Sequence, residues 1–256
     1  RTSERVLFFF GENEYVQTIF MKKNDSLTTA FDVPQGITAL VGGGGKTTLM
    51  LHLAQELAQH GARVIVTTTT HIFPPEGIPT GNPVNAEEVA HALLIEPLLC
   101  LGKPLKDGKL GAPDLTMTAL SCLADYVLVE ADGAKRLPLK APSEYEPVIP
   151  AETQLVIAVA GLDGAGQPIQ DAAFRSGLYA ALCGKREADI VTPRDIALVL
   201  THEAGQRKDV PNGARFAVLL NKADDAVRKA TAQEVAAELN NDSVERVVIA
   251  SLGGES

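Results

Sequence analysis

The sequence predicts an α/β fold in which helices flank a mostly parallel sheet and a small helical insertion interrupts the alternation. From Ile37 onward, short apolar runs alternate with stretches of helical periodicity. The runs are apolar at nearly every position, which is typical of strands that helices cover on both faces. In addition, a run of glycines at residues 42–45 joins the first of these strands to the first long helix.

The strands and helices follow from periodicity and from their boundary residues. The helix predicted at residues 47–60 ends at Gly61, which suits a C-terminal cap. The helix at residues 85–95 has Asn85 as its N-cap and Glu88 three residues later, a box-like pair. A short helix is expected at residues 114–123. The strands are predicted at residues 37–41, 63–70, 98–102, 126–132, 155–161, 215–224 and 246–251.

Two further helical patterns predict the insertion, at about residues 165–212. The first covers about residues 172–182. The second covers residues 193–203, with Thr192 as its N-cap, Pro193 at its first position and Gly205 after its end.

The composition is that of a soluble globular protein. The chain has 256 residues, 45% hydrophobic and 21% charged, which is enough to bury a sizeable core. A formal net charge of −9 argues against a nucleic acid or an anionic membrane as the main partner. Cys100, Cys122 and Cys183 lack metal-binding spacing, and no apolar run reaches the roughly 20 residues that span a bilayer. We therefore expect a reduced, cytoplasmic protein.

The N-terminal end is set apart from the functional argument. Met21 opens a stretch that would serve as a natural start, and the apolar run at residues 6–10 is too short to span a membrane. Residues 1–20 are either a native edge strand or an added segment. We accordingly divide the chain into an N-terminal extension at residues 1–30 and one α/β domain at residues 31–256.

The glycine run has the setting of a phosphate-binding loop, because it lies between a buried strand and an amphipathic helix. Glycines allow backbone amides to turn around a phosphate, the lysine that follows bridges the terminal phosphates, and the next hydroxyl binds Mg²⁺. Leu40 stands where the pattern G-x-x-x-x-G-K-[ST] has its first glycine, so the loop is expected to begin at Gly42. The alternative is a glycine-rich turn without a ligand. The expected nucleotide-binding residues here are Gly42, Gly43, Gly44, Gly45, Lys46, Thr47 and Thr48, with Thr47 on the metal.

Two acids at the end of the strand at residues 126–132 suit a magnesium site opposite this loop. We expect Asp132 to hold the metal through water and Glu130 to position or deprotonate the attacking water. Lys46, Glu130 and Asp132 are thus the predicted catalytic residues. Acids at strand ends also occur as solubilising residues or helix caps, which is the alternative.

Four threonines end the second strand and His71 follows them, near the edge where ligands of such sheets bind. Thr68, Thr69 and Thr70 could contact phosphate or hydrated metal, or could simply favour a strand through their β-branching. His71 is expected to form loop hydrogen bonds instead of acting as a base.

The stretch NKAD, residues 221–224, predicts a guanine-binding loop. The Asp224 carboxylate would accept from the ring N–H and the exocyclic amine of guanine, which adenine does not offer. Asn221 would fix the loop, the Lys222 stem would cover the base, and Ser251 lies near a backbone amide that could reach the base oxygen. The alternative is that Asp224 caps the helix that follows.

Together, the stretches VGGGGKTT, VTTTTH, VEADGAKRLPLKAP, GQRKDVP and LLNKAD resemble the YqeC family of proposed selenium-dependent hydroxylase accessory proteins. The likeness runs from about residue 31 to residue 251. It implies a P-loop NTPase fold and a role in the maturation of a selenium-dependent molybdenum hydroxylase. The partner would be that client metalloenzyme or its cofactor-maturation machinery.

Basic residues follow the proposed acids and occur again in the insertion. Lys135, Arg136 and Lys140 could stabilise transition-state charge or bind an anionic substrate, or could belong to a solvated loop. Arg175 and Lys208 could line the same cleft or lie on the surface.

The function expected from these residues is a Mg²⁺-dependent nucleoside triphosphatase, with GTP favoured over ATP, that serves as a maturation or delivery factor. One alternative is a small-molecule kinase or nucleotidyltransferase-like enzyme with the same phosphate site. Another is a nucleotide-gated binding protein that does not hydrolyse its ligand.

Overall fold

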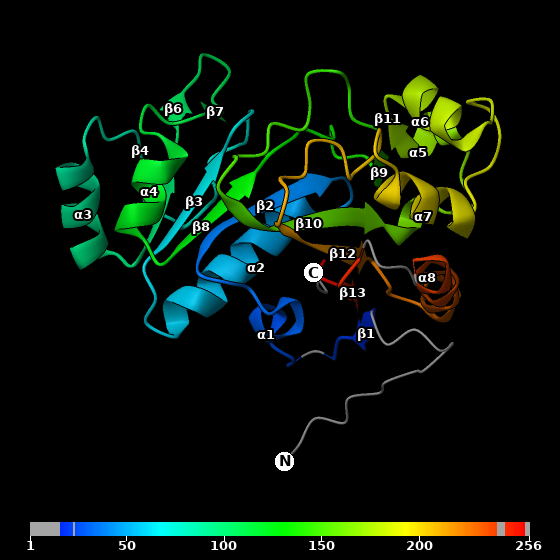
Figure 1. Cartoon of the computed structure of the whole chain (residues 1–256), viewed down its shortest axis with the longest axis horizontal. Coiled ribbons are helices and arrows are strands. Elements are labelled where there is room, and N and C mark those ends of the chain that lie inside the picture. The colour runs from blue at the N-terminus through cyan, green and yellow to red at the C-terminus, as the bar shows by residue number, and fades with distance from the viewer. Residues whose placement is uncertain (1–15, 23, 240–243, 254–256) are drawn as a thin grey trace.

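The computed structural model describes residues 16–22, 24–239 and 244–253. The described residues form one nine-stranded sheet in which every pairing is parallel (Figure 1). The predicted α/β class with a mostly parallel sheet is therefore confirmed. In spatial order the strands are β1 (Gln17–Phe20), β13 (Arg246–Ile249), β12 (Arg215–Asn221), β10 (Thr153–Gly161), β2 (Gly36–Gly42), β8 (Tyr126–Glu130), β3 (Val64–Thr68), β5 (Leu98–Leu101) and β4 (Thr80–Gly81).

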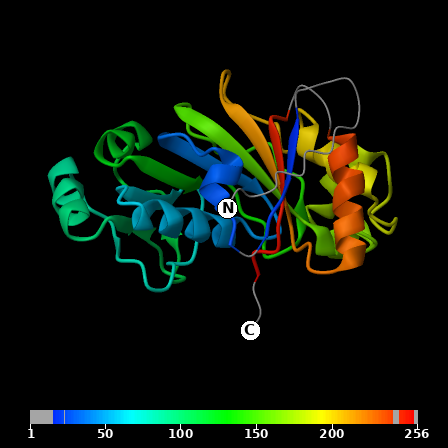
Figure 2. The same cartoon turned by 90° about the horizontal axis from the view of Figure 1, so that it is seen from below.

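Helices cover both faces of this sheet (Figure 2). On one face, α1 (Leu27–Phe31) and α2 (Lys46–Gln59) pack over Leu40 of β2. On the other face, α3 (Ala86–Ile95) and α4 (Met117–Leu123) pack over Ile37, while α7 (Pro193–Thr201) and α8 (Ala226–Glu238) share a core with Ala39. Successive residues of β2 thus point to opposite layers, which explains why its sequence is apolar at every position except Thr38.

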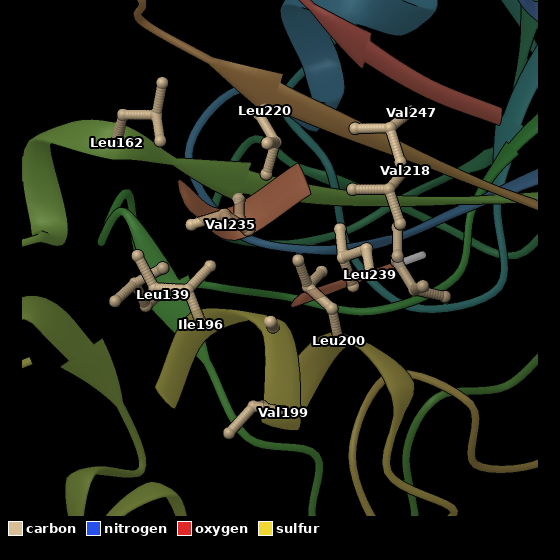
Figure 3. Close-up of a cluster of buried hydrophobic side chains, with 14 of the residues drawn as sticks. Leu139, Leu162, Ile196, Val199, Leu200, Val218, Leu220, Val235, Leu239 and Val247 are labelled. Carbon is tan, nitrogen blue, oxygen red and sulfur yellow. The ribbon is translucent and has the colours of Figure 1, made fainter. Parts of the chain in front are cut away.

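The core between α7, α8 and the sheet holds the insertion in place (Figure 3). Ile196 and Leu200 of α7 meet Val235 of α8 and Val218 of β12, all buried. The predicted second helix of the insertion is confirmed, with a capping box between Thr192 and Asp195.

The predicted first helix of the insertion, at residues 172–182, is wrong as one continuous helix. The chain forms α5 (Ile169–Ala172), then β11 (Ala173–Phe174), then α6 (Ser176–Cys183). β11 pairs with β9 (Leu139–Lys140), and Arg175 is left-handed with φ 60°. Pairing with a strand far away in sequence therefore overrides the local helix propensity.

The other boundaries differ little from prediction. Asn85 caps α3 by accepting from Glu88 N at 2.9 Å, and Gly61 follows α2 with φ 84°. The helix predicted from residue 114 begins instead at Met117, because Thr116 provides the N-cap. The remaining elements are β6 (Lys103–Pro104), β7 (Leu110–Gly111) and the 3-10 helix η1 (Leu162–Gly164).

The N-terminal end joins the fold where it is described. β1 pairs with β13, and Ser26 caps α1. Residues 1–15, including the apolar run at residues 6–10, lie outside the described residues. Among the described helices, none has both the length and the apolarity that crossing a bilayer requires.

Candidate nucleotide-binding site

The predicted site residues lie where neighbouring strands end. The glycine loop begins at the end of β2, Glu130 ends β8, and Asn221 ends β12. These strands are parallel and close in the sheet, so their carboxyl ends meet at the same edge (Figure 1). The fold thus brings the glycine loop, the acids and the NKAD stretch together.

The loop needs glycine both for its backbone and for its packing. Gly42, Gly44 and Gly45 have φ angles of 95°, 80° and 132°, which other residues rarely adopt. A Cβ atom on Gly44 would lie 2.3 Å from Gly161 N, and one on Gly45 would lie 2.3 Å from the Asn221 amide nitrogen. The loop is therefore rigidly supported from behind by β10 and β12.

The amides of Gly43 and Gly44, like that of Gly42, are used inside the protein. Gly43 N donates to Val159 O at 2.9 Å, and Gly44 N donates to Leu137 O at 3.0 Å. In this conformation these two amides do not face an anion as expected. The amides of residues 45–48, in contrast, have no acceptor among the described residues. They lie at the N-terminus of α2, where unpaired N–H groups and the helix dipole favour a negative charge.

The Lys46 side chain lies back across the loop and is only 4% exposed. Its Nζ donates to Gly42 O at 2.6 Å and lies 3.1 Å from Asp132 Oδ1 and 3.9 Å from Glu130 Oε1. Burial lowers the pKa of Lys46, but the facing carboxylates of Asp132 and Glu130 raise it more, so the net direction is upward. Lys46 is thus an ammonium group held at the start of α2.

The Thr47 side chain contacts Glu130 and not Asp132, the acid expected to share the metal with it. Its hydroxyl donates to Glu130 Oε2 at 2.7 Å. Asp132 lies beyond the end of β8 and turns away, accepting from Gly42 N at 3.1 Å through Oδ2. Burial raises the pKa of Glu130, although the charge of Lys46 opposes this shift.

Asp132 belongs to a network of alternating charges that is buried at Asp132 and Lys140 and partly exposed at its other end. Lys140 Nζ lies 2.9 Å from Asp132 Oδ2 and 2.6 Å from Glu146 Oε2, and it also donates to Gly133 O at 2.6 Å. Glu146 Oε2 in turn accepts from Arg175 at 2.7 Å. Since its three donors are all used and its side chain is 0% exposed, Lys140 supports the site and does not face a ligand. Nothing in the sequence around Glu146 signalled its part in this network.

The oxygens of Thr47 and Glu130 fit Mg²⁺. They are hard ligands of the kind this ion prefers. Across the described residues, no three His, Cys, Asp or Glu side chains are gathered as a metal cage. The donor set therefore suits an ion that arrives with a nucleotide and keeps phosphate oxygens and waters as its other ligands.

The threonines at the end of β3 and directly after it are mostly engaged within the protein. The Thr68 hydroxyl donates to Glu130 O at 2.8 Å, and the Thr69 hydroxyl donates to Val148 O at 2.7 Å. The Thr70 hydroxyl lies 3.4 Å from that of Thr68, and His71 is exposed. Thr70 is thus the one of the three whose hydroxyl is not committed to a backbone carbonyl.

Asn221 connects the phosphate loop to the NKAD stretch. It is 2% exposed, its Nδ2 donates to Gly44 O at 2.8 Å, and its Oδ1 accepts from Leu252 N at 3.0 Å. Lys222 is left-handed, with φ 64°, and pairs with Asp163 at 2.6 Å. The Asn221 side chain thereby fixes the glycine loop relative to the segment after β13.

Asp224 is not a helix cap. The N-cap of α8 is Asp225, which accepts from Arg228 N at 2.8 Å. The Asp224 carboxylate accepts instead from the Arg228 guanidinium at 2.8 Å and from the Ser251 hydroxyl. This exposed carboxylate is thus oriented by two side chains, one of which is Ser251.

The other basic residues divide into two groups. Lys208 Nζ donates to the carbonyl oxygens of Ser143, Glu144 and Glu146. It therefore stabilises the loop at residues 143–146. Lys135 and Arg136 are exposed.

Comparison with known proteins gives two matches. The family model described as "YqeC protein" matches residues 38–177, more than half of the chain. The protein called "Uncharacterized protein YqeC" from Escherichia coli (strain K12) is 31% identical over 222 residues. That alignment covers 82% of this chain and 85% of the relative.

Proposed function

The chain belongs to the YqeC protein family, and from that premise we propose that it binds and hydrolyses a nucleoside triphosphate with Mg²⁺. The observation that carries this proposal is the set of amides at residues 45–48, which have no acceptor among the described residues and lie beside the Lys46 ammonium. Four donors and one cation at a helix start favour an anionic ligand such as a polyphosphate.

In the proposed complex, Lys46 exchanges its contact with Gly42 O for oxygens of the β- and γ-phosphates. Asp132 keeps Lys140 and Gly42 N as partners, so it remains paired after this exchange. The buried network thus allows Lys46 to move without leaving a bare carboxylate. Asp132 is in this view a positioning residue, which replaces the metal-binding role first expected of it.

The Thr47 hydroxyl and Glu130 would hold Mg²⁺. When bound, the ion neutralises charge on the phosphate oxygens. Glu130 orients the Thr47 hydroxyl at 2.7 Å. The role first expected of Glu130, to position or deprotonate the attacking water, is the alternative to this metal-binding role.

Guanine is the proposed base. Asp225 caps α8, which leaves Asp224 for recognition, and Asn221 ties the base loop to the phosphate loop. The role in maturing a selenium-dependent molybdenum hydroxylase, with that enzyme or its cofactor machinery as client, is proposed from the family resemblance alone. We propose the cytoplasm as the site of action on composition alone.

The test is equilibrium binding of fluorescent GDP, GTP and ATP analogues, with and without Mg²⁺. Wild type should prefer guanine nucleotides, and Asp224→Ala should lose that preference while keeping affinity for the phosphates. Asp225→Asn is the matched control, since it alters the neighbouring carboxylate but preserves the cap. Failure of every nucleotide to bind would refute the proposal, and equal binding of adenine nucleotides would refute its guanine part.

Turnover decides between hydrolysis and the alternatives. Phosphate release by the protein alone supports a triphosphatase. Turnover that requires an added small-molecule acceptor supports a kinase-like enzyme. Tight binding without turnover in either assay supports a nucleotide-gated binding protein.

A further inference from the structure

A turn of two cationic residues lies directly against the phosphate loop. Leu137 N donates to Ala134 O at 2.9 Å, and the two residues between them, Lys135 and Arg136, have φ angles of 48° and 63°. Positive φ at both central positions is the type I′ turn, which normally takes Asn and Gly. Leu137 O accepts from Gly44 N, so this turn is fixed to the loop that the proposed nucleotide occupies.

The residues with strained backbone conformations in this region are cationic. Lys135, Arg136 and Arg175 are all left-handed although none is glycine. Such a conformation costs roughly 1–3 kcal/mol per residue and is concentrated at ligand-binding sites. Both turn side chains are exposed, so the strained turn presents two long cationic side chains to solvent beside the phosphate loop.

Three of the cations gather around the half-buried ring of Phe174. The Arg175 guanidinium lies 4.6 Å from the ring centroid, Lys135 Nζ 5.0 Å and Lys140 Nζ 5.8 Å. The ring holds these side chains through cation–π attraction. Phe174 belongs to β11, which pairs with β9, so the insertion is joined to the turn through this cluster.

The cluster has an excess of positive charge. Lys140 and Arg175 share Glu146, and Lys140 also pairs with Asp132. Lys135 and Arg136 make no ion pair within the described part of the chain. Two exposed, unneutralised cations beside the phosphate loop stand out in a protein with a formal net charge of −9.

We propose that Lys135 and Arg175, which lie over the ring of Phe174, form a second oxyanion subsite together with Arg136, the neighbour of Lys135 in the turn. It binds the phosphate or carboxylate group of a small molecule that lies next to the nucleotide phosphates. The inference extends the proposed function, since it assigns a second ligand to the same site. Arg175 reaches this ligand while it keeps its bond to Glu146, because a guanidinium has five donors.

The test is an NMR titration of the ¹⁵N-labelled full chain with inorganic pyrophosphate and, separately, with citrate. Wild type should shift two sets of amides, those of residues 45–48 and those of Phe174 and Arg175. The variant with Lys135→Asn and Arg136→Gly preserves the type I′ turn in its preferred sequence, so it should be at least as stable as wild type. It should weaken the response of Phe174 and Arg175 about tenfold and leave that of residues 45–48 unchanged.

Lys106→Gln, at an exposed lysine of the β6–β7 hairpin, is the charge control and should change neither response. A response to pyrophosphate alone identifies a phosphorylated ligand, and a response to citrate alone identifies a carboxylate. If neither anion shifts Phe174 and Arg175, or if the Asn–Gly variant responds as wild type does, the subsite is refuted. If wild type responds at Phe174 and Arg175 but not at residues 45–48, the proposed nucleotide site is refuted and the subsite is not.

Discussion

The phosphate end and the base end of the candidate site are built in different ways. At the phosphate end, the side chains of Lys46, Asp132 and Lys140 are 4%, 0% and 0% exposed, and each charge has an opposite partner. At the base end, the Asp224 and Arg228 side chains are 43% and 34% exposed. Breaking a buried ion pair is costly, whereas an exposed pair contributes little. Stability should therefore depend on the phosphate end, and substitutions at the base end should change stability little.

The largest effect is expected from Asp132→Ala. Removing this carboxylate leaves Lys46 and Lys140 buried with only part of their counter-charge, which should lower the free energy of unfolding by about 3–5 kcal/mol. Urea denaturation measures this loss. Asp224→Ala, the matched exposed carboxylate, should cost less than about 1 kcal/mol. Similar losses for the two variants would contradict the comparison.

Gly44→Ala should come next. Its φ of 80° disfavours any side chain by roughly 1–3 kcal/mol, and its Cβ would also lie 2.3 Å from Gly161 N. Gly133→Ala is the control, because a Cβ there would meet no atom within 4 Å, and its cost should stay within about 0.5 kcal/mol. Thermal unfolding of both variants checks the difference. A Gly44→Ala protein as stable as wild type would mean that the loop is loosely held.

A smaller effect should emerge from the pH dependence of stability. Burial raises the pKa of Glu130 above its ordinary value of 4.5, so the folded protein retains a proton that the unfolded chain releases. Stability should thus fall as the pH rises from 4.5 towards the pKa in the folded state, by at most about 1.4 kcal/mol per pH unit, and remain constant above it.

Glu130→Gln should remove this loss. Urea midpoints measured from pH 4.5 to pH 7 for both proteins test it, since the difference between them should widen with pH in favour of the variant. Parallel curves would show that Glu130 does not carry the dependence.

Arg228→Ala should give the smallest effect. The guanidinium holds Asp224 at 2.8 Å, but both side chains are partly exposed, so the change in unfolding free energy should lie below about 1 kcal/mol and shrink with added salt. Denaturation at low and high salt measures this. A loss comparable to that of Asp132→Ala would show that the base end, too, belongs to the stable core.

Much of the fold was predictable because its signals are local. Apolar runs marked the inner strands of the sheet, and Asn85 and Thr192 marked helix starts that the structure confirms. The helix predicted at residues 172–182 failed because β11 pairs with β9, about thirty residues earlier in the chain. Hydrophobic periodicity within one short stretch of sequence carries no information about pairing with a distant strand.

The sequence by itself determined the candidate site to the level of segments. The glycine run, the acids after β8 and the NKAD stretch each follow an apolar strand, and parallel strands bring such ends to one edge of the sheet. Only the tertiary structure decided the contacts: that Thr47 meets Glu130, that Asp132 lies between two lysines, and that Asp225 caps α8. Hydrogen bonds and ion pairs act over about 3 Å, and the distances between side chains of separate strands at that scale are set by packing and not by sequence order.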